Sequence, residues 1–173
     1  MEKVYNSLPL EFIMCGGDWL NNGETQAHAC YMLSKIKGQM KKSFDKYHLV
    51  LGNHDTNYQG LIAEGSEANS GKLTQQTINN LWYGEYGKSY YAFNGINTKF
   101  YVFDCGVDWS HGSITDLDTE QIDFFIEELD KNDDSHIAIA SHMVYLWDEA
   151  VHPLINKITE IANVYNNRGT VEH

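Results

Sequence analysis

Three short apolar segments constrain the fold of this chain most, because each one ends in glycine or serine and then in polar side chains. They read "LEFIMCGGD" from Leu10, "YHLVLGNHD" from Tyr47 and "HIAIASHM" from His136. Apolar runs of this length, bounded by turn residues, are typical of buried strands. Any fold that the chain adopts must therefore bury three strands and still present polar groups at the end of each.

Helical patterns separate these strands. Thr25 to about Phe44 places apolar residues near one face, and residues 73–82 and 148–165 are further helix candidates. Asn94-Gly95 lies between two aromatic-rich runs, which indicates a β-hairpin. Asp118 begins another helix in a capping box with Gln121, and its apolar stripe comprises Ile122, Phe125, Ile126 and Leu129. This alternation predicts a single α/β domain over residues 1–173, with helices covering its sheets.

The charge of the chain narrows the classes of partner. Its formal net charge is −12, so we expect no broad surface for nucleic acid. No apolar run approaches the roughly 20 residues that cross a bilayer, so we expect no membrane partner. Cys15, Cys30 and Cys105 are too few and too widely spaced for a disulfide scaffold. These features predict a cytoplasmic protein with reduced thiols.

The polar strand ends suggest a metal site. In open α/β sheets ligands bind at the carboxyl ends of strands, so Asp18, Asn53, His54 and His142 are expected to converge. Carboxylate, amide and imidazole ligands together suit a divalent cation such as Mn²⁺, Fe²⁺ or Zn²⁺. Taken singly, Asp18 is more often a turn residue or helix cap, Asn53-His54-Asp55 fits a polar turn, and His142 fits a hydrogen-bonded core histidine.

The same blocks resemble a known family. "GGDWLNN", "VLGNHD" and "IAIASHM" are similar to the second, third and fourth sequence blocks of the calcineurin-like metallophosphoesterases. "YGKSYYAFNGINTKFYVFDC" and "DTEQIDFFIEEL" resemble the hairpin and the helix between those blocks, so the resemblance covers about residues 10–165. It implies a sandwich of two β-sheets flanked by α-helices, and hydrolysis of phosphoric esters.

The resemblance also implies roles for individual residues. Asp18 matches the carboxylate that bridges two metal ions, while Asn53 and His142 match ligands of the second ion. His54 matches the general acid that protonates the leaving oxygen, and Asp55 is a candidate to orient His54. The implied cofactor is a divalent metal ion, Mn²⁺ first, with Fe²⁺ or Zn²⁺ as alternatives. The implied substrate is a phosphorylated compound of undetermined type.

Two family blocks have no counterpart. Residues 1–17 contain no His and no Asp, so the opening Asp-x-His block is missing, and neither His152 nor His173 lies in a closing Gly-His-x-His block. Asp134-Ser135-His136 spells Asp-x-His, but it precedes its strand and would lie at the opposite end of the sheet from His142. We therefore expect a domain truncated at both ends, or a divergent member that binds one metal ion.

Three functional hypotheses follow from this incomplete set. The first is a metal-dependent phosphoesterase whose activity is weak because the first-metal ligands are missing. The second is an inactive fragment or interaction module that keeps the fold. The third is an α/β binding domain whose polar strand ends are coincidental. A missing first strand would also leave a sheet edge exposed, which predicts a homodimer formed through that edge.

Overall fold

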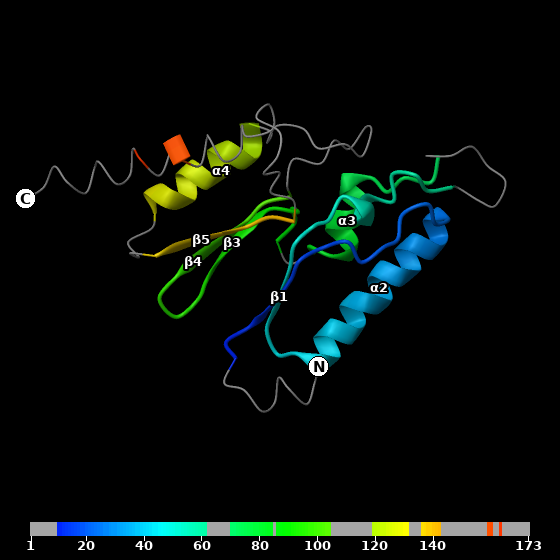
Figure 1. Cartoon of the computed structure of the whole chain (residues 1–173), viewed down its shortest axis with the longest axis horizontal. Coiled ribbons are helices and arrows are strands. Elements are labelled where there is room, and N and C mark those ends of the chain that lie inside the picture. Colours follow the sequence, from blue (N-terminus) through cyan, green and yellow to red (C-terminus); the bar gives the residue numbers. More distant parts are fainter. Residues whose placement is uncertain are drawn as a thin grey trace, which may run out of the picture.

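The computed structural model describes residues 10–61, 70–84, 86–104, 119–131 and 136–142, together with residues 159, 160 and 163. Within these ranges strands and helices alternate, as Figure 1 shows. The elements, in chain order, are β1 (Ile13–Cys15), α2 (Gln26–Ser43), β2 (Tyr47–Leu49), the short 3₁₀ helix η1 (His54–Thr56), α3 (Gln75–Leu81), β3 (Tyr91–Asn94), β4 (Lys99–Val102), α4 (Thr119–Asp130) and β5 (Ile137–Ala140).

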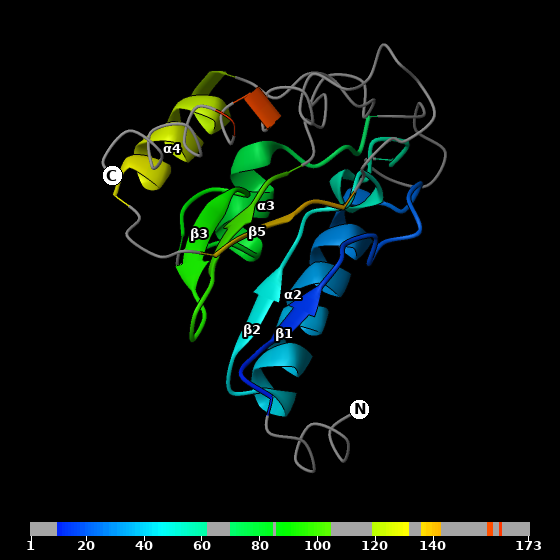
Figure 2. The same cartoon turned by 60° about the vertical axis from the view of Figure 1, so that its left-hand side comes forward.

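The first half is a β–α–β unit in which β1 and β2 pair in parallel, with Met14 opposite His48. The connecting helix α2 begins after Thr25, whose side chain accepts a hydrogen bond from the His28 amide. The buried face of α2 packs into the main core, and Figure 2 shows α2 behind the two strands. The predicted helix from Thr25 to about Phe44 is confirmed, because Thr25 is its N-cap and Phe44 its C-cap.

The second sheet has the order β3-β4-β5. Strands β3 and β4 form the hairpin that Asn94-Gly95 predicts, with Asn94 opposite Lys99 and the Gly95 amide donating to the Thr98 carbonyl at 2.8 Å. Strand β5 pairs in parallel with β4. Helix α4 covers one face of this sheet, where the Phe125 ring packs edge-on against Tyr101 at 4.8 Å between centroids.

Aromatic side chains join the two sheets. Phe12, just before β1, contacts His48 of β2 and Phe93 of β3, with ring centroids 5.3 and 5.1 Å apart. The Tyr91 hydroxyl accepts a hydrogen bond from the Leu49 amide at 3.0 Å and donates one to the Leu49 carbonyl at 2.9 Å. The expected α/β class, with two sheets and covering helices, is therefore confirmed.

Some predicted elements differ from the structure. Both early strands are shorter than the apolar runs that predicted them, although Val50 still donates to the Cys15 carbonyl at 2.8 Å beyond the end of β2. The third run was expected to be a buried strand, yet Ile137 and Ile139 of β5 are 44% and 39% exposed. This prediction was wrong because the described residues leave the face of β5 that carries these two side chains only partly covered.

Other predictions fall partly or wholly beyond the described ranges. The helix expected over residues 148–165 lies outside them, apart from residues 159, 160 and 163, which are helical. In the predicted stripe of α4, Phe125 and Leu129 are buried, whereas the Ile122 side chain lies outside the described set. None of the helices described here is both long and apolar enough to cross a bilayer.

Candidate functional site

The loops that follow β1 and β2 approach each other so closely that glycine is required on both sides. A Cβ atom on Gly17 would lie 2.6 Å from the Gly52 backbone nitrogen, and Gly17 has a φ of 91°. A Cβ atom on Gly52 would overlap the backbone nitrogen and Oδ1 of Asp18. Asp18 itself has a left-handed φ of 57°, a conformation that aspartate tolerates better than most residues. The two loops therefore position the Asp18 carboxylate over the end of β2.

Asp55 holds this arrangement together. Its buried carboxylate accepts four backbone hydrogen bonds: from Trp19 at 2.7 Å, from Asp18 and Gly52 at 2.9 Å each, and from Leu20 at 3.1 Å. Each oxygen receives two of them, which fills its lone pairs. Burial raises the pKa of the Asp55 carboxyl to about 6, although the backbone amides of Gly52, Leu20 and Trp19 oppose the rise. One side chain thus fixes the loop after β1 against the loop after β2.

This geometry changes the role assigned to Asp55. The sequence suggested that Asp55 orients His54, but both of its oxygens are occupied by backbone amides. Asp55 is accordingly a positioning residue for the loop that carries Asp18. The His54 backbone amide donates to Asp18 Oδ1 at 3.0 Å, and the ring of His54 lies 6.3 Å from that of Tyr58, edge to face.

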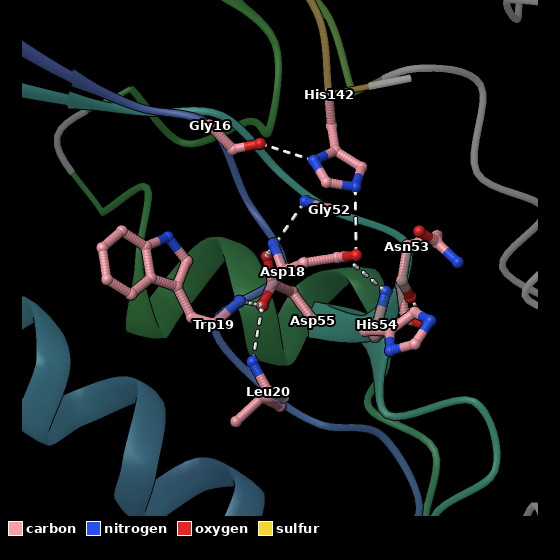
Figure 3. A network of polar contacts seen from close by, with 10 residues as sticks. Gly16, Asp18, Trp19, Leu20, Gly52, Asn53, His54, Asp55 and His142 are labelled. Atoms are coloured by element: carbon pink, nitrogen blue, oxygen red, sulfur yellow. Dashed lines mark hydrogen bonds and ion pairs between the residues drawn. The ribbon is translucent and has the colours of Figure 1, made fainter. Parts of the chain in front are cut away.

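His142, which follows β5, meets Asp18 at the same end of the molecule (Figure 3). Its Nδ1 lies at hydrogen-bonding distance from the Gly16 carbonyl oxygen. Because a carbonyl only accepts, Nδ1 carries the proton and donates it, which leaves the lone pair of a neutral imidazole on Nε2. In that neutral form Nε2 faces Asp18 Oδ2 as an acceptor at 3.1 Å, whereas a doubly protonated ring would donate to Oδ2. Two acceptors at this separation are stable together only when positive charge lies between or on them.

The chemistry of this pair fits a divalent cation. Two ligands that each lie about 2.1 Å from one ion, at about a right angle, are themselves about 3 Å apart. The 3.1 Å between Asp18 Oδ2 and His142 Nε2 matches that separation. A histidine ligand commonly donates its other ring N–H to a backbone carbonyl, as His142 does to Gly16. A second proton on His142 is the alternative source of positive charge.

The third ligand that the sequence names is an amide. Asn53 directly precedes His54, whose backbone amide binds Asp18, and Figure 3 draws Asn53 in the same region. Among the residues that the structure describes, no group of three or more His, Cys, Asp and Glu side chains is placed to hold a metal ion. A cation here would therefore rest on one carboxylate, one imidazole and one amide. The arrangement brings all five predicted site residues to one end of the sheets.

Sequence reasoning missed several parts of this site. It treated the glycines only as turn markers, whereas Gly16 supplies the carbonyl that orients His142, and Gly17 and Gly52 permit the close approach of the loops. The Trp19 indole nitrogen is buried and has no hydrogen-bond partner among the described residues. The sequence signal available was the adjacency of Gly16, Gly17 and Trp19 to Asp18, and of Gly52 to Asn53. The rejected His136 precedes β5, at the opposite end of that strand from His142, as predicted.

Comparison with protein families agrees with this geometry. The family model for calcineurin-like phosphoesterases matches residues 1–164, nearly the whole chain. A search of the curated proteins found no match. The match spans the blocks that carry Asp18, the Asn53–Asp55 cluster and His142, which are the segments that meet in space. The chain therefore belongs to the calcineurin-like phosphoesterase family.

Proposed function

We propose that this chain hydrolyses phosphoric esters with the help of one divalent cation bound by Asp18, Asn53 and His142. The observation that carries the proposal is the close approach of Asp18 Oδ2 and His142 Nε2, at 3.1 Å. Membership of a phosphoesterase family supports the reaction class. The chain's net charge of −12 makes such a cation the natural means of attracting a phosphorylated substrate to this end of the molecule.

The protein's own residues have separate tasks in this reaction. A bound cation would supply positive charge to the phosphoryl oxygens and make a water molecule more acidic. His54, whose backbone is tied to Asp18, is proposed to donate a proton from its ring to the leaving oxygen. Asp55 holds the Asp18 loop through its four amide contacts and touches no substrate. Gly16 keeps the His142 ring in the orientation that exposes Nε2.

Turnover is expected to be slow. A two-metal clamp stabilises both the attacking and the leaving oxygen, and it needs ligands for a second ion. Residues 1–17 provide no His or Asp for this purpose.

We propose Mn²⁺ as the cation, although metal availability weighs as heavily as ligand type. The cytoplasm remains the proposed compartment.

A generic phosphodiester assay tests the proposal. We expect bis(p-nitrophenyl) phosphate to be cleaved in the presence of Mn²⁺. The cleavage rate is expected to fall at least a hundredfold in His54→Gln, because general-acid catalysis typically contributes about that factor or more. His136→Gln is the matched control, because His136 is exposed and lies at the other end of β5. Equal rates in the His54→Gln variant and the parent would refute the assigned role of His54.

The second candidate is a non-catalytic interaction module, which the incomplete ligand set favours. It predicts neither turnover nor Mn²⁺ binding, so both measurements on the parent chain separate the two candidates.

We also propose that two copies associate through a sheet edge, since within the described ranges β1 pairs only with β2. Elution as a stable monomer in size-exclusion chromatography would contradict this association.

A further inference from the structure

A cavity of about 510 Å³ lies away from the candidate metal centre. The end of α2, the start of β2, the end of α3 and strand β3 form its walls, and its lining includes Lys37, Lys41, Lys46, Tyr86, Tyr91 and Phe93. Tyr47 begins β2 at the cavity, whereas Gly52 and His54 follow the other end of this strand at the site. Five extended residues span about 15 Å, so the two places are distinct. The volume falls in the usual range for small-ligand sites.

The charge around this cavity is opposite to that of the chain. Three lysines line it against one aspartate, Asp45, in a protein whose net charge is −12. Lys41 and Lys46 are exposed, and neither has an ion-pair partner among the described residues. Lys41, in the last turn of α2, also complements the helix macrodipole, but Lys46 lies beyond the helix. Two exposed ammonium groups that line one cavity, without ion-pair partners among the described residues, indicate a preference for an anion.

The aromatic wall beside these lysines is ordered. The Tyr86 and Tyr91 rings are stacked, with centroids 3.9 Å apart and planes 10° apart. Hydrogen bonds to the amide and carbonyl of Leu49 fix Tyr91, and Tyr86 is 41% exposed. A wall that is already fixed loses little conformational entropy when a flat ring packs against it. Such a surface favours a planar aromatic group.

His48 adds ring surface to this wall and no charge. It stacks on Phe93, with centroids 3.3 Å apart and planes 6° apart. Burial and the nearby Lys46 charge lower the pKa of His48 to about 4, so the imidazole is neutral near pH 7. The lining therefore combines the positive charge of lysines with uncharged ring surface.

We propose that this cavity binds a small aromatic anion of the nucleoside monophosphate type, with its base against the Tyr86 wall and its phosphate at Lys41 and Lys46. Stacking on aromatic side chains is worth about 1–3 kcal/mol per base and is tolerant of base identity. Lysine ammonium groups are strong donors to phosphate. The proposal is independent of the phosphoesterase function, because none of the cavity-lining residues belongs to the metal centre.

Isothermal titration calorimetry with AMP, adenosine and inorganic phosphate tests this proposal, in EDTA so that no metal ion draws phosphate to the other site. AMP is expected to bind at least tenfold more tightly than adenosine or phosphate alone. The double variant Lys41→Gln/Lys46→Gln is expected to lose at least tenfold in AMP affinity. The matched control is Lys35→Gln/Lys42→Gln, which removes two exposed charges of α2 outside the cavity, and is expected to change affinity less than twofold.

Two further variants complete the test. Tyr86→Leu is expected to weaken AMP binding at least fivefold and to leave phosphate binding unchanged, while His54→Gln is expected to leave AMP binding unchanged. Absence of AMP binding at 1 mM, or an equal loss in both lysine double variants, would overturn the proposal. Loss of AMP binding in His54→Gln would also overturn it, by locating the nucleotide at the metal centre. Failure of the phosphoesterase assay alone would leave these binding results standing.

Discussion

Replacement of His48 by phenylalanine should flatten the dependence of stability on pH. His48 lies between the edge of Phe12 and the face of Phe93, where the phenyl ring of phenylalanine, one atom larger than imidazole, can keep the stacking. Burial, together with the charge of Lys46, lowers the pKa of His48 from 6.5 to about 4. Between pH 6.5 and pH 4, His48 is therefore protonated in the unfolded chain but mostly neutral in the folded protein. Stability linked to His48 is fully present above pH 6.5 and is lost as the pH falls toward 4.

The magnitude follows from the size of the shift. Between pH 6.5 and pH 4.5 the imidazole is protonated in the unfolded chain but largely neutral in the folded protein. Each pH unit in this interval therefore lowers the free energy of unfolding by about 1.4 kcal/mol, and the two units lower it by about 3 kcal/mol. Water reaches the partly exposed ring, which reduces the expected loss to about 2 kcal/mol. The parent protein should therefore lose about 2 kcal/mol more than His48→Phe between pH 7 and pH 4.5.

Urea unfolding of both proteins at the two pH values measures this difference. All other titrating groups are shared, so subtracting one pH effect from the other isolates His48. His48→Leu serves as a second reference, because it removes the same titrating group but also the ring stack. Loss of the stack should lower the free energy of unfolding by about 1 kcal/mol at every pH. Equal pH effects in the parent and both variants would refute the reasoning, as would an imidazole of His48 that NMR finds charged at pH 5.

Two other variants probe the loops that carry the site. Asp55→Ala should lower the free energy of unfolding by about 3 kcal/mol, because the buried amides of Leu20 and Gly52 lose their acceptors. Urea unfolding checks this, and a loss below about 1 kcal/mol would contradict it. Gly52→Ala should cost about 2 kcal/mol and weaken Mn²⁺ binding at least tenfold, since a Cβ atom overlaps Asp18. Gly16→Ala is the control, because a Cβ atom there meets nothing within 4 Å, and equal Mn²⁺ affinities in the two variants would argue against the close approach.

The periodic parts of the fold were predictable from sequence because local patterns determine them. The extent of α2 followed from the helical spacing of apolar residues between Thr25 and about Phe44, and the β3–β4 hairpin followed from Asn94-Gly95. Burial of β5 was not predictable in this way. The run "IAIA" reads as buried, but exposure of Ile137 depends on what packs over its face of the sheet, which is a tertiary property.

The site was predictable in its composition but not in its internal contacts. The convergence of Asp18 and His142 followed from their positions after strands, since strand ends gather ligands. The role of Asp55 did not follow, because its four partners are backbone amides, which leave no mark in a sequence. Likewise, the left-handed φ of Asp18 and the contact of Gly17 with Gly52 arise only when the two loops meet.

An anomalous difference map from a crystal soaked in Mn²⁺ tests the metal centre most directly. We predict one peak within coordination distance of Asp18 Oδ2, His142 Nε2 and the Asn53 side-chain oxygen. The same soak of His142→Ala should show no peak there. A parent map without density between Asp18 and His142, or with Mn²⁺ bound only elsewhere, would contradict the proposed metal centre.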